Sequence, residues 1–467
     1  MLKKVIAFLL ISSFSLSFVA CNKNEKVEPS AAPTSSEATK APEAAKLTGK
    51  IDFWLMPNSA APDKDLLSVC KGFQDANPDV TITPTVIDWG SAWTKITAAA
   101  TSGEAPDVTQ LGTTWVGAIS YMNALADLTD KVDFTKFSDA TLATAGLMGS
   151  DKKTAAPWFC ETRAIFYRTD ACQKAGVDPT KDFDTWDSFK AALKKLNNVE
   201  VDGKKLPALG MPGKNDWNVV HNFAPWIYGA GGDYIAADGK SAVFNSAEAL
   251  EGIKFYSELA VEGLMDKASL EKNTSDVESA FTNGGYATAI LGPWNIATLE
   301  SNKKKFEANP AEGNNLVDKV GVAMIPAGPK DRKAFCGGST LAIFDSSENK
   351  DASVALINYL TDKDAQVAYA TITGNLPTNK EAYNDASIAD HPMRKVFKAQ
   401  MEFAKAYPSI ASWGPSETYF QQGLSKIWDN AMEVSGKYDW EVSKKAVEEV
   451  ISQVNTVISQ NDTGVKK

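Results

Sequence analysis

Eight of the twelve tryptophans in this 467-residue sequence follow a predicted strand or lie in a loop rich in glycine and proline. The stretch YATAILGPWNI, residues 286–296, shows the pattern: a predicted strand ends at Leu291, Gly292-Pro293 follow, and Trp294 precedes a predicted helix. Carboxyl ends of strands border the ligand crevice of open α/β sheets. We therefore predict that at least three of these indoles line one cleft. The eight are Trp54, Trp89, Trp115, Trp158, Trp217, Trp226, Trp294 and Trp413.

The chemistry that such rings favour is stacking on the apolar C–H face of a pyranose, which leaves the sugar hydroxyls to polar neighbours. Hydrogen bonds to charged groups contribute about 1.5–3 kcal/mol each. Each polar candidate also has a bland explanation: Asp88 could cap the next helix, Glu161 and Arg163 could form a salt bridge, and the Gly337-Gly338 pair could be a hinge. The candidates are Asp88, Gln110, Thr113, Glu161, Arg163 and the backbone of Gly337-Gly338-Ser339.

Strands and helices that alternate from residue 50 to about 128 must position these residues. The alternation predicts a mostly parallel sheet covered by helices. A more helical half follows, and extended segments at 157–169, 291–294 and 335–340 look like connections between two lobes. Hinged lobes with a cleft between them are expected from such crossings. Trp93, Trp186, Trp428 and Trp440 fall in helical patterns and are predicted to lie in the core.

The first residues have the features of an export signal: MLKK is basic, and the apolar run that follows ends at Phe18-Val19-Ala20-Cys21. This ending resembles a bacterial lipobox, with Phe18 where leucine is usual. We expect a signal peptide over 1–20, a lipidated Cys21 and a disordered tether over 21–48, which is rich in Ala, Pro, Ser, Thr and Glu. Ordinary cleavage near Ala20 is the alternative. No later stretch is apolar enough to span a membrane.

Composition argues against several classes of function. The net charge is -10 without a long basic block, which disfavours nucleic acid as a partner, and two histidines disfavour a multi-histidine metal site. The sequence contains no G-x-S-x-G or Walker A motif, so we expect no catalytic residues, metal or cofactor, although a glycosidase carboxylate pair stays open. Four further cysteines match no metal motif, and their pairing is open; they are Cys70, Cys160, Cys172 and Cys336.

Five stretches of this sequence resemble those of a known family. The stretches ANPDVTI, GEAPDVTQLGTTWVG, PWFCETRAIFYRTD and YATAILGPWNI are similar to those of extracellular solute-binding proteins of the family 1 carbohydrate type, the receptor subunits of ABC importers. So is GGSTLAIFDSSENKDASVALINYLTDKDAQVAYATITGNLPTNKEAY. The resemblance spans most of residues 50–385 and does not identify the ligand.

The resemblance implies an α/β, two-lobed periplasmic-binding-protein-like fold of type II. We expect residues 49–160 with about 295–335 in lobe 1, and about 161–294 with 336–467 in lobe 2. A monomer, held on the membrane by its lipid, would capture a sugar between the lobes and deliver it to permease subunits. Cys160 and Cys336 lie at crossings, where a disulfide would restrain the hinge. The expected ligand-binding residues are Trp54, Asp88, Trp89, Thr113, Trp115, Glu161, Arg163, Trp226, Trp294, Gly338 and Trp413.

Other functions remain open from sequence. A glycerol phosphate would need several Arg or Lys side chains, and only Arg163 stands out. A polyamine would need an acidic aromatic box, which Trp294, Asp88 and Glu161 could supply. A surface carbohydrate hydrolase, or a sensory or adhesive lipoprotein with the same fold, are further alternatives.

Overall fold

The computed structural model describes residues 46–214, 216 and 218–462. The predicted signal peptide, Cys21, most of the predicted tether and Trp217 lie outside these residues. The first of two main sheets has six strands, in the order β13-β4-β12-β3-β1-β2. β1 pairs in parallel with β2 and β3, whereas β12 runs antiparallel to β3 and β4, and β13 antiparallel to β4. Its strands are β1 (Gly49–Leu55), β2 (Val80–Val86), β3 (Val108–Gly112), β4 (Ala156–Glu161), β12 (Gly337–Ile343) and β13 (Leu376–Pro377).

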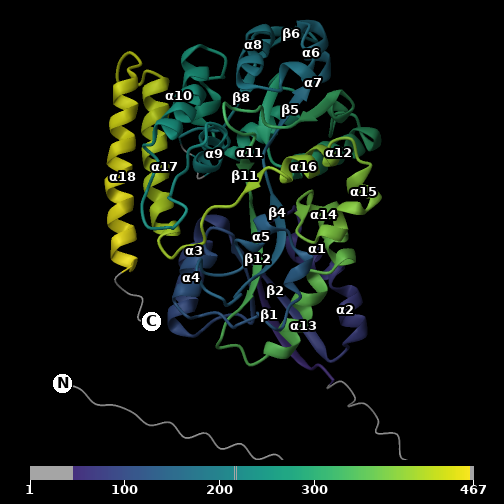
Figure 1. Ribbon diagram of the computed structural model, residues 1–467. Helices are drawn as coiled ribbons and strands as arrows, with labels where there is room; N and C mark the ends of the chain where they lie inside the picture. Colours follow the sequence, from purple (N-terminus) through teal and green to yellow (C-terminus); the bar gives the residue numbers. More distant parts are fainter. Residues whose placement is uncertain (1–45, 215, 217, 463–467) are drawn as a thin grey trace, which may run out of the picture. The chain divides into compact units, whose positions relative to one another are not determined.

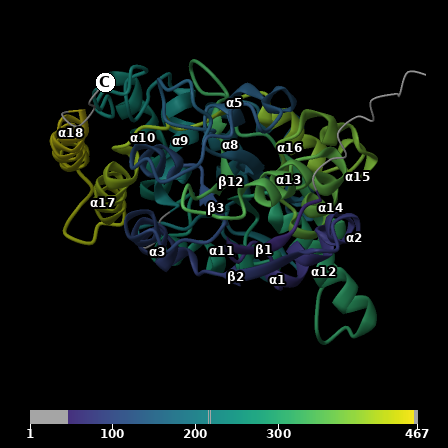
Figure 2. The ribbon, with the colours of Figure 1, turned by 90° about the horizontal axis from the view of Figure 1, so that it is seen from below.

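Helices cover both faces of this sheet because its strands carry apolar residues on both faces. Ile51, Phe53 and Leu55 of β1 are buried with residues of α1, α13 and α14, and Leu111 of β3 is buried with residues of α3 and α4. Figures 1 and 2 show α3 on one side of the sheet and α13 on the other. These helices are α1 (Pro62–Val69), α2 (Lys71–Ala76), α3 (Trp89–Ser102), α4 (Val116–Tyr121), α5 (Asp139–Leu142), α13 (Lys350–Leu360) and α14 (Lys363–Thr373).

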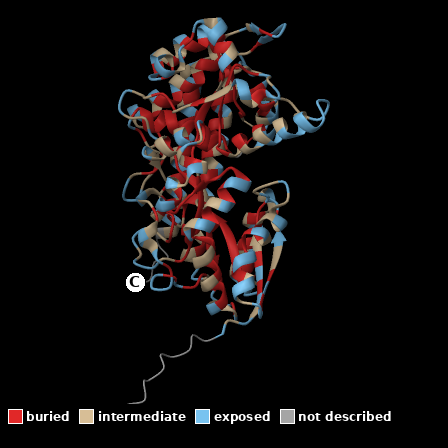
Figure 3. Cartoon of the chain, turned by 90° about the vertical axis from the view of Figure 1, so that its right-hand side faces the viewer, coloured by how far each residue is buried: buried red, intermediate tan, exposed pale blue. Residues whose placement is uncertain are grey.

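A second sheet has four strands in the order β10-β5-β9-β8. Side chains of β5 alternate between two cores: Ile165 packs with residues of α8, α9 and α10, and Phe166 with residues of α11, α12 and α16. This is the two-residue period of a strand buried on both faces, and Figure 3 shows buried residues running along the strands. The strands are β5 (Ala164–Arg168), β8 (Leu209–Gly210), β9 (Thr288–Leu291) and β10 (Val320–Ala323).

The helices around the second sheet include a long C-terminal pair, α17 and α18, which pack against one another. They are α6 (Thr169–Ala175), α7 (Pro179–Asp182), α8 (Trp186–Leu196), α9 (Val219–Gly229), α10 (Ala247–Val261), α11 (Thr274–Thr282), α12 (Trp294–Ala308), α15 (Ala386–Ala389), α16 (Arg394–Met401), α17 (Trp413–Ala431) and α18 (Trp440–Asp462). Two short pairs complete the strands: β6 (Val199–Val201) with β7 (Lys204–Leu206), and β11 (Ala334–Phe335) with β14 (Ala404–Lys405). Within the described residues, every helix is too short or too polar to cross a membrane.

The α/β fold with two sheets agrees with the prediction, but the grouping of the later strands differs from it. The segment 295–335 was expected with the first lobe, yet β10 pairs antiparallel with β5 of the second sheet. The segment from 336 was expected with the second lobe, yet β12 lies inside the first sheet. When paired strands lie so far apart in the sequence, no local sequence pattern predicts their pairing. The exact lobe boundaries stay a proposal.

The chain passes between the sheets at Thr162-Arg163, between β10 and β12, and after β13. The predicted crossing at 291–294 is instead a turn that leads from β9 into α12. Two of the crossing segments pair with each other, because β11 and β14 form a parallel two-stranded sheet.

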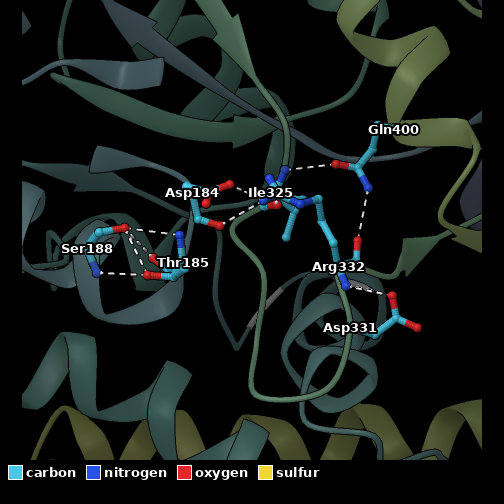
Figure 4. A network of polar contacts seen from close by, with 7 residues as sticks. All are labelled: Asp184, Thr185, Ser188, Ile325, Asp331, Arg332 and Gln400. Atoms are coloured by element: carbon cyan, nitrogen blue, oxygen red, sulfur yellow. Dashed lines mark hydrogen bonds and ion pairs between the residues drawn. The ribbon is translucent and has the colours of Figure 1, made fainter. Parts of the chain in front are cut away.

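Polar contacts hold the loop before β11 (Figure 4). The side chain of Gln400 accepts from Ile325 N at 2.8 Å and donates to Arg332 O at 3.2 Å, and Arg332 also bonds Asp184. Thr185 and Ser188 beside Asp184 form the capping box of α8. The crossing is therefore anchored to α8 and α16 before it reaches the first sheet.

The tryptophans divide differently from the prediction. Trp186 and Trp428 are buried as predicted, whereas Trp93 and Trp440 keep part of their surface exposed. The prediction that Trp226 lies in a loop is wrong: it lies within α9, fully buried between Phe189 and Tyr256. Pro225 suggested a loop, but it lies inside α9, where burial of every residue of the helix outweighs the proline penalty.

We expect Trp428→Ala to lower the free energy of unfolding by about 3–5 kcal/mol, because Trp428 packs against Phe223 and Tyr256 without exposed surface and truncation leaves a cavity. Thermal unfolding of the purified protein measures this. Val442→Ala on the neighbouring helix, where the side chain is 49% exposed, is the control and should stay within about 0.5 kcal/mol of wild type. A wild-type melting temperature for the tryptophan variant would contradict the assignment.

Candidate functional site

Most of the predicted ligand-binding residues meet at one edge of the six-stranded sheet. The parallel strands β1, β2 and β3 end there, β4 ends there with Glu161, and β12 begins there because it runs the opposite way. The register places Gly337 opposite Glu161, Gly338 opposite Cys160, and Ser339 opposite Gly112. Residues at or just beyond this edge are Trp54, Asp88, Trp89, Thr113, Trp115, Glu161, Arg163 and Gly338.

Three indoles form an aromatic group at this edge. The ring centroids of Trp89 and Trp115 lie 5.7 Å apart, and those of Trp93 and Trp115 lie 5.8 Å apart. Trp54, from the end of β1, packs against the same buried cluster, and all four side chains keep part of their surface exposed. Trp93 was predicted to be a core residue, and its place in this group was missed because it lies in the middle of a helical pattern.

The polar residues at this edge already have partners. Asp88 caps α3 by accepting from Gly90 N at 2.8 Å, which is the bland explanation of its position. Gln110 donates to Ser339 Oγ at 2.7 Å and to Asn58 Oδ1 at 3.1 Å, so it ties β3 to β12 and to the loop after β1. Thr113 N donates to Gly338 O at 3.2 Å. These contacts fix the positions of the edge residues.

Gly338 has a structural reason of its own. Its φ is +116°, a region that residues with a Cβ rarely adopt, and a Cβ there would overlap the carbonyl oxygen of Phe159. The glycine therefore allows β12 to pass close to β4 at the point where the chain enters the first sheet.

Arg163 lies between the two sheets and is 3% exposed. Its guanidinium bonds the Glu161 carboxylate, donates to Asn218 Oδ1 at 3.2 Å and lies 5.1 Å from the centroid of the Trp294 ring. The salt bridge with Glu161 was the bland explanation, and it is present. The contact with Trp294 connects the end of β4 to the end of β9, which belongs to the second sheet.

Trp294 begins α12 and is held at several points. Its Nε1 donates to Glu278 Oε1 of α11 at 2.7 Å, and Asn295 Nδ2 donates to the same oxygen at 3.0 Å. A Cβ at Gly292 would overlap the indole, so the ring lies directly against that glycine. Burial raises the pKa of Glu278, and the hydrogen bonds from Asn295 and Trp294 and the Arg163 charge lower it in part.

Sequence reasoning missed Glu278 and Asn218. Glu278 precedes Trp294 by 16 residues and lies on a different helix. No local pattern marks that contact.

Two predicted binding residues belong to the core in this structure. Trp226 lies inside α9, and Trp413 at the start of α17 has no exposed surface. Trp413 stacks on Tyr407 at 4.2 Å between ring centroids. The stack continues through Phe335 to His221, with centroids 4.9 Å and 4.0 Å apart, so Trp413 completes an aromatic ladder at the crossing. Trp158 is also buried, stacked on Tyr369.

Glu417, one turn after Trp413, is a buried carboxyl that the sequence did not single out. Among the described residues, its Oε1 has no hydrogen-bond partner. Burial raises the pKa of Glu417 to about 7, and interactions with the Trp413 and Thr114 side chains lower it in part. Because Thr114 lies between Thr113 and Trp115, this carboxyl borders the edge described above.

One cavity of about 710 Å³ lies elsewhere, between α12, β10 and the segment around His391. Four of its charged or titratable residues are paired: Glu300 contacts His391 Nε2 at 2.8 Å, and Lys303 contacts Asp318 at 2.7 Å. None of the predicted binding residues lines it.

Metal and disulfide chemistry find little support in the described part of the chain. No three of its His, Cys, Asp and Glu side chains are grouped so that they could hold a metal ion. Cys70, Cys160, Cys172 and Cys336 are free thiols, and Cys160 Sγ donates to Pro377 O at 3.3 Å. The two crossing cysteines therefore do not lock the hinge in this structure.

Comparison with known proteins agrees with this architecture. The profile of the family described as bacterial extracellular solute-binding protein matches residues 68–396, more than half of the chain. A binding protein of Brucella abortus is 27% identical over 82% of this chain and 88% of its own. The diacetylchitobiose binding protein DasA of Streptomyces coelicolor is 26% identical over 94% and 98%. The sn-glycerol-3-phosphate-binding periplasmic protein UgpB of Escherichia coli is 25% identical over 69% and 72%.

Solved structures show the same fold. An ABC transporter solute-binding protein of Thermotoga lettingae, bound with α-D-tagatose, superposes with a TM-score of 0.74 at 20% identity and covers 88% of this chain and 100% of its own. UgpB of Mycobacterium tuberculosis in complex with glycerophosphocholine has a TM-score of 0.70 at 22% identity, over 88% and 99%.

We predict that Glu417→Gln changes the pH dependence of stability. The carboxyl binds its proton more tightly when folded, with a pKa of about 7, than when unfolded, near 4.3. Its contribution to stability is therefore full below about pH 4.3 and is lost as the pH rises through 7. From pH 5 to pH 8, the stability of the glutamine variant should therefore rise relative to wild type by about 2–4 kcal/mol.

Thermal and urea unfolding of both proteins from pH 5 to pH 8 measure this difference. Glu251→Gln, an exposed carboxylate change on α10, is the matched control and should give a difference that does not vary with pH. A Glu417 difference that is equally flat would show that the carboxyl is solvated in the folded protein.

Proposed function

The chain belongs to the bacterial extracellular solute-binding protein family, and from this premise we propose that it captures a carbohydrate, an oligosaccharide in particular, and delivers it to the permease of an ABC importer. It is a solute-binding protein of the ABC transporter type and not an enzyme. The observation that carries the carbohydrate proposal is the presence of partly exposed indoles beside polar groups, both at the edge where β1, β2 and β3 end and at Trp294, which Arg163 contacts from the first sheet.

The composition of this group suits a ring with an apolar face. Trp54, Trp89, Trp115 and Trp294 keep part of their surface exposed, and an indole stacks well on the C–H face of a sugar. Relatives over nearly the whole chain include a diacetylchitobiose binding protein, and a structural relative holds α-D-tagatose. Both lines of support point to a carbohydrate without choosing among sugars.

The charged side chains around Trp294 do not favour the glycerol phosphate alternative, although UgpB proteins are among the relatives. Arg163 is the one cation among the predicted binding residues, and Glu161 and Asn218 already engage its guanidinium. Glu278 adds a carboxylate beside the Trp294 ring. The negative charges of Glu161 and Glu278 would repel a phosphate ester placed there, because charges in a partly buried site are weakly screened. A polyamine would find Asp88 used as a helix cap and Glu161 paired.

We propose that binding closes the two sheets and their helices around the sugar as hinged lobes, with the ligand contacting both sides. A ligand that contacts the closed form more extensively shifts the population toward it. The closed monomer would then dock on permease subunits, with the ATPase supplied by another chain.

A thermal-shift screen of the full-length chain tests the ligand class. The panel contains maltose, N,N′-diacetylchitobiose, D-tagatose, galacto-oligosaccharides, glycerol 3-phosphate, glycerophosphocholine and spermidine. We expect a sugar to raise the melting temperature, since a ligand at a thousand times its Kd adds about 4 kcal/mol of stability. A shift with a phosphate ester or spermidine and none with the sugars would contradict the carbohydrate proposal. Release of smaller sugars during incubation would contradict a function limited to binding.

For the sugar with the largest shift, Trp294→Ala should weaken binding by about 1–3 kcal/mol, by analogy with stacking on other planar ligands. The melting temperature without ligand should change little, because the ring is partly exposed. Isothermal titration calorimetry measures the affinity. Trp440→Ala, a partly exposed indole on α18, is the matched control and should bind normally. Equal affinities for wild type and Trp294→Ala would refute the stacking role.

We also propose that residues 1–20 are removed on export and that Cys21 carries the lipid that holds the protein on the membrane through a tether over 21–48. Cys21→Ser should move the protein from the membrane fraction to the soluble fraction and abolish lipid labelling, whereas Cys70→Ala should leave both unchanged. Fractionation followed by mass spectrometry of the mature N-terminus makes the measurement. A wild-type N-terminus with an unmodified Cys21 would support ordinary cleavage instead.

A further inference from the structure

Glu278 accepts a hydrogen bond from the Trp294 indole, although it lies on another helix. Its Oε1 accepts one hydrogen bond from Trp294 Nε1 at 2.7 Å and a second from Asn295 Nδ2 at 3.0 Å. Asn295 is 1% exposed and also contacts Gly292 O at 3.3 Å. One carboxylate oxygen thus joins α11 to the first two residues of α12.

We propose that Glu278 is a positioning residue that fixes the orientation of the Trp294 indole and so sets which part of the ring a ligand meets. This role rests on the proposed function, because it assumes that Trp294 contacts the sugar. Glu278 itself acts through the indole and makes no ligand contact in this proposal.

The other contacts of Trp294 leave the indole little freedom. The Arg163 guanidinium lies over the ring, and Gly292 lies against it on the turn before α12. A Cβ at Gly292 would displace the ring, which explains why a glycine precedes Pro293. With the N–H directed to Glu278, the ring has lost rotamer freedom before any ligand arrives, and preorganisation of this kind strengthens binding by reducing the entropy lost on association.

The same contacts restrict the chemistry that Trp294 offers. The indole has one hydrogen-bond donor, and Glu278 takes it. A ligand therefore meets carbon atoms of the ring and not a donor, so Trp294 selects for an apolar C–H face and not for a hydroxyl or a phosphate oxygen. This deepens the carbohydrate proposal, because a cyclic sugar has such a face and glycerol phosphate does not.

A purely structural role is the competing explanation, since the same hydrogen bonds also attach α11 to α12. The two roles differ in their readouts. A structural link affects stability, whereas a positioning role affects the environment of one indole and the affinity for a stacked ligand. The charges that face Glu278 from neighbouring elements are Arg163 and Glu161, both at the crossing between β4 and β5.

The first experiment needs no ligand. In ¹⁵N spectra of the full-length protein, the indole signal of Trp294 is identified by its loss in Trp294→Phe. We expect hydrogen exchange of this indole proton to accelerate at least tenfold in Glu278→Ala, with a smaller change in Glu278→Gln, whose amide oxygen can still accept. Asp276→Ala, which removes an exposed carboxylate from the same helix, should leave the signal unchanged. Unchanged exchange in Glu278→Ala would overturn the proposal.

The second experiment separates positioning from structure. With maltose and N,N′-diacetylchitobiose as probes, we expect Glu278→Ala to weaken binding roughly tenfold, in line with loss of a hydrogen bond to a charged group. In the Trp294→Phe background, which has no indole N–H, the same change should have no further effect. Additive losses would mean that Glu278 acts independently of the indole. If neither sugar binds, the sugar with the largest thermal shift takes their place; if no sugar in the panel binds, the proposed ligand class fails, while the exchange experiment still decides the role of Glu278.

Discussion

The insertion of β12 between β3 and β4 is the constraint on which the site depends. β12 comes from a part of the chain more than 170 residues after β4, and its antiparallel register sets Gly337-Gly338 against Cys160 and Glu161. At Gly338 only a residue without a Cβ fits so close to β4, because a Cβ there would overlap the Phe159 carbonyl oxygen. β12 pairs with both β3 and β4 and so fixes where these two strands end. Trp115 lies shortly after the end of β3, and Arg163 lies shortly after the end of β4.

Arg163 then connects the two sheets electrostatically and sterically. It is almost fully buried, so its charge needs compensation, which Glu161 and Asn218 provide. The guanidinium lies over the Trp294 ring, whose Nε1 donates to Glu278. The arrangement places two carboxylates and one guanidinium around a single ring, so the group carries excess negative charge when both carboxylates are ionised. A neutral ligand adds nothing to that imbalance, whereas a phosphate would increase it.

The sequence predicted what local patterns encode. The alternation of strands and helices from residue 50 and the strand ends before Trp89, Trp115 and Trp294 are local, and these residues do lie at the edges of the sheets. Pairing of β10 with β5 and the place of β12 were not predictable, since neither strand carries a mark of its distant partner. Trp226 was misplaced because Pro225 suggested a loop, and Glu278 was missed because its contact with Trp294 exists only once α11 and α12 pack.

The fate of Trp413 shows how structure and binding compete for aromatic residues in this chain. The crossing segments need an apolar core of their own, and the ladder of His221, Phe335, Tyr407 and Trp413 supplies it. Burial, together with the nearby Arg163 charge, holds the pKa of His221 well below its usual range, so the imidazole stays neutral and stacks without a charge to solvate. Trp413 is fully buried in this ladder, so it has no exposed surface that a ligand could contact. In the proposed function, stacking on a sugar would therefore fall to the indoles that remain partly exposed, at the ends of β1, β2, β3 and β9.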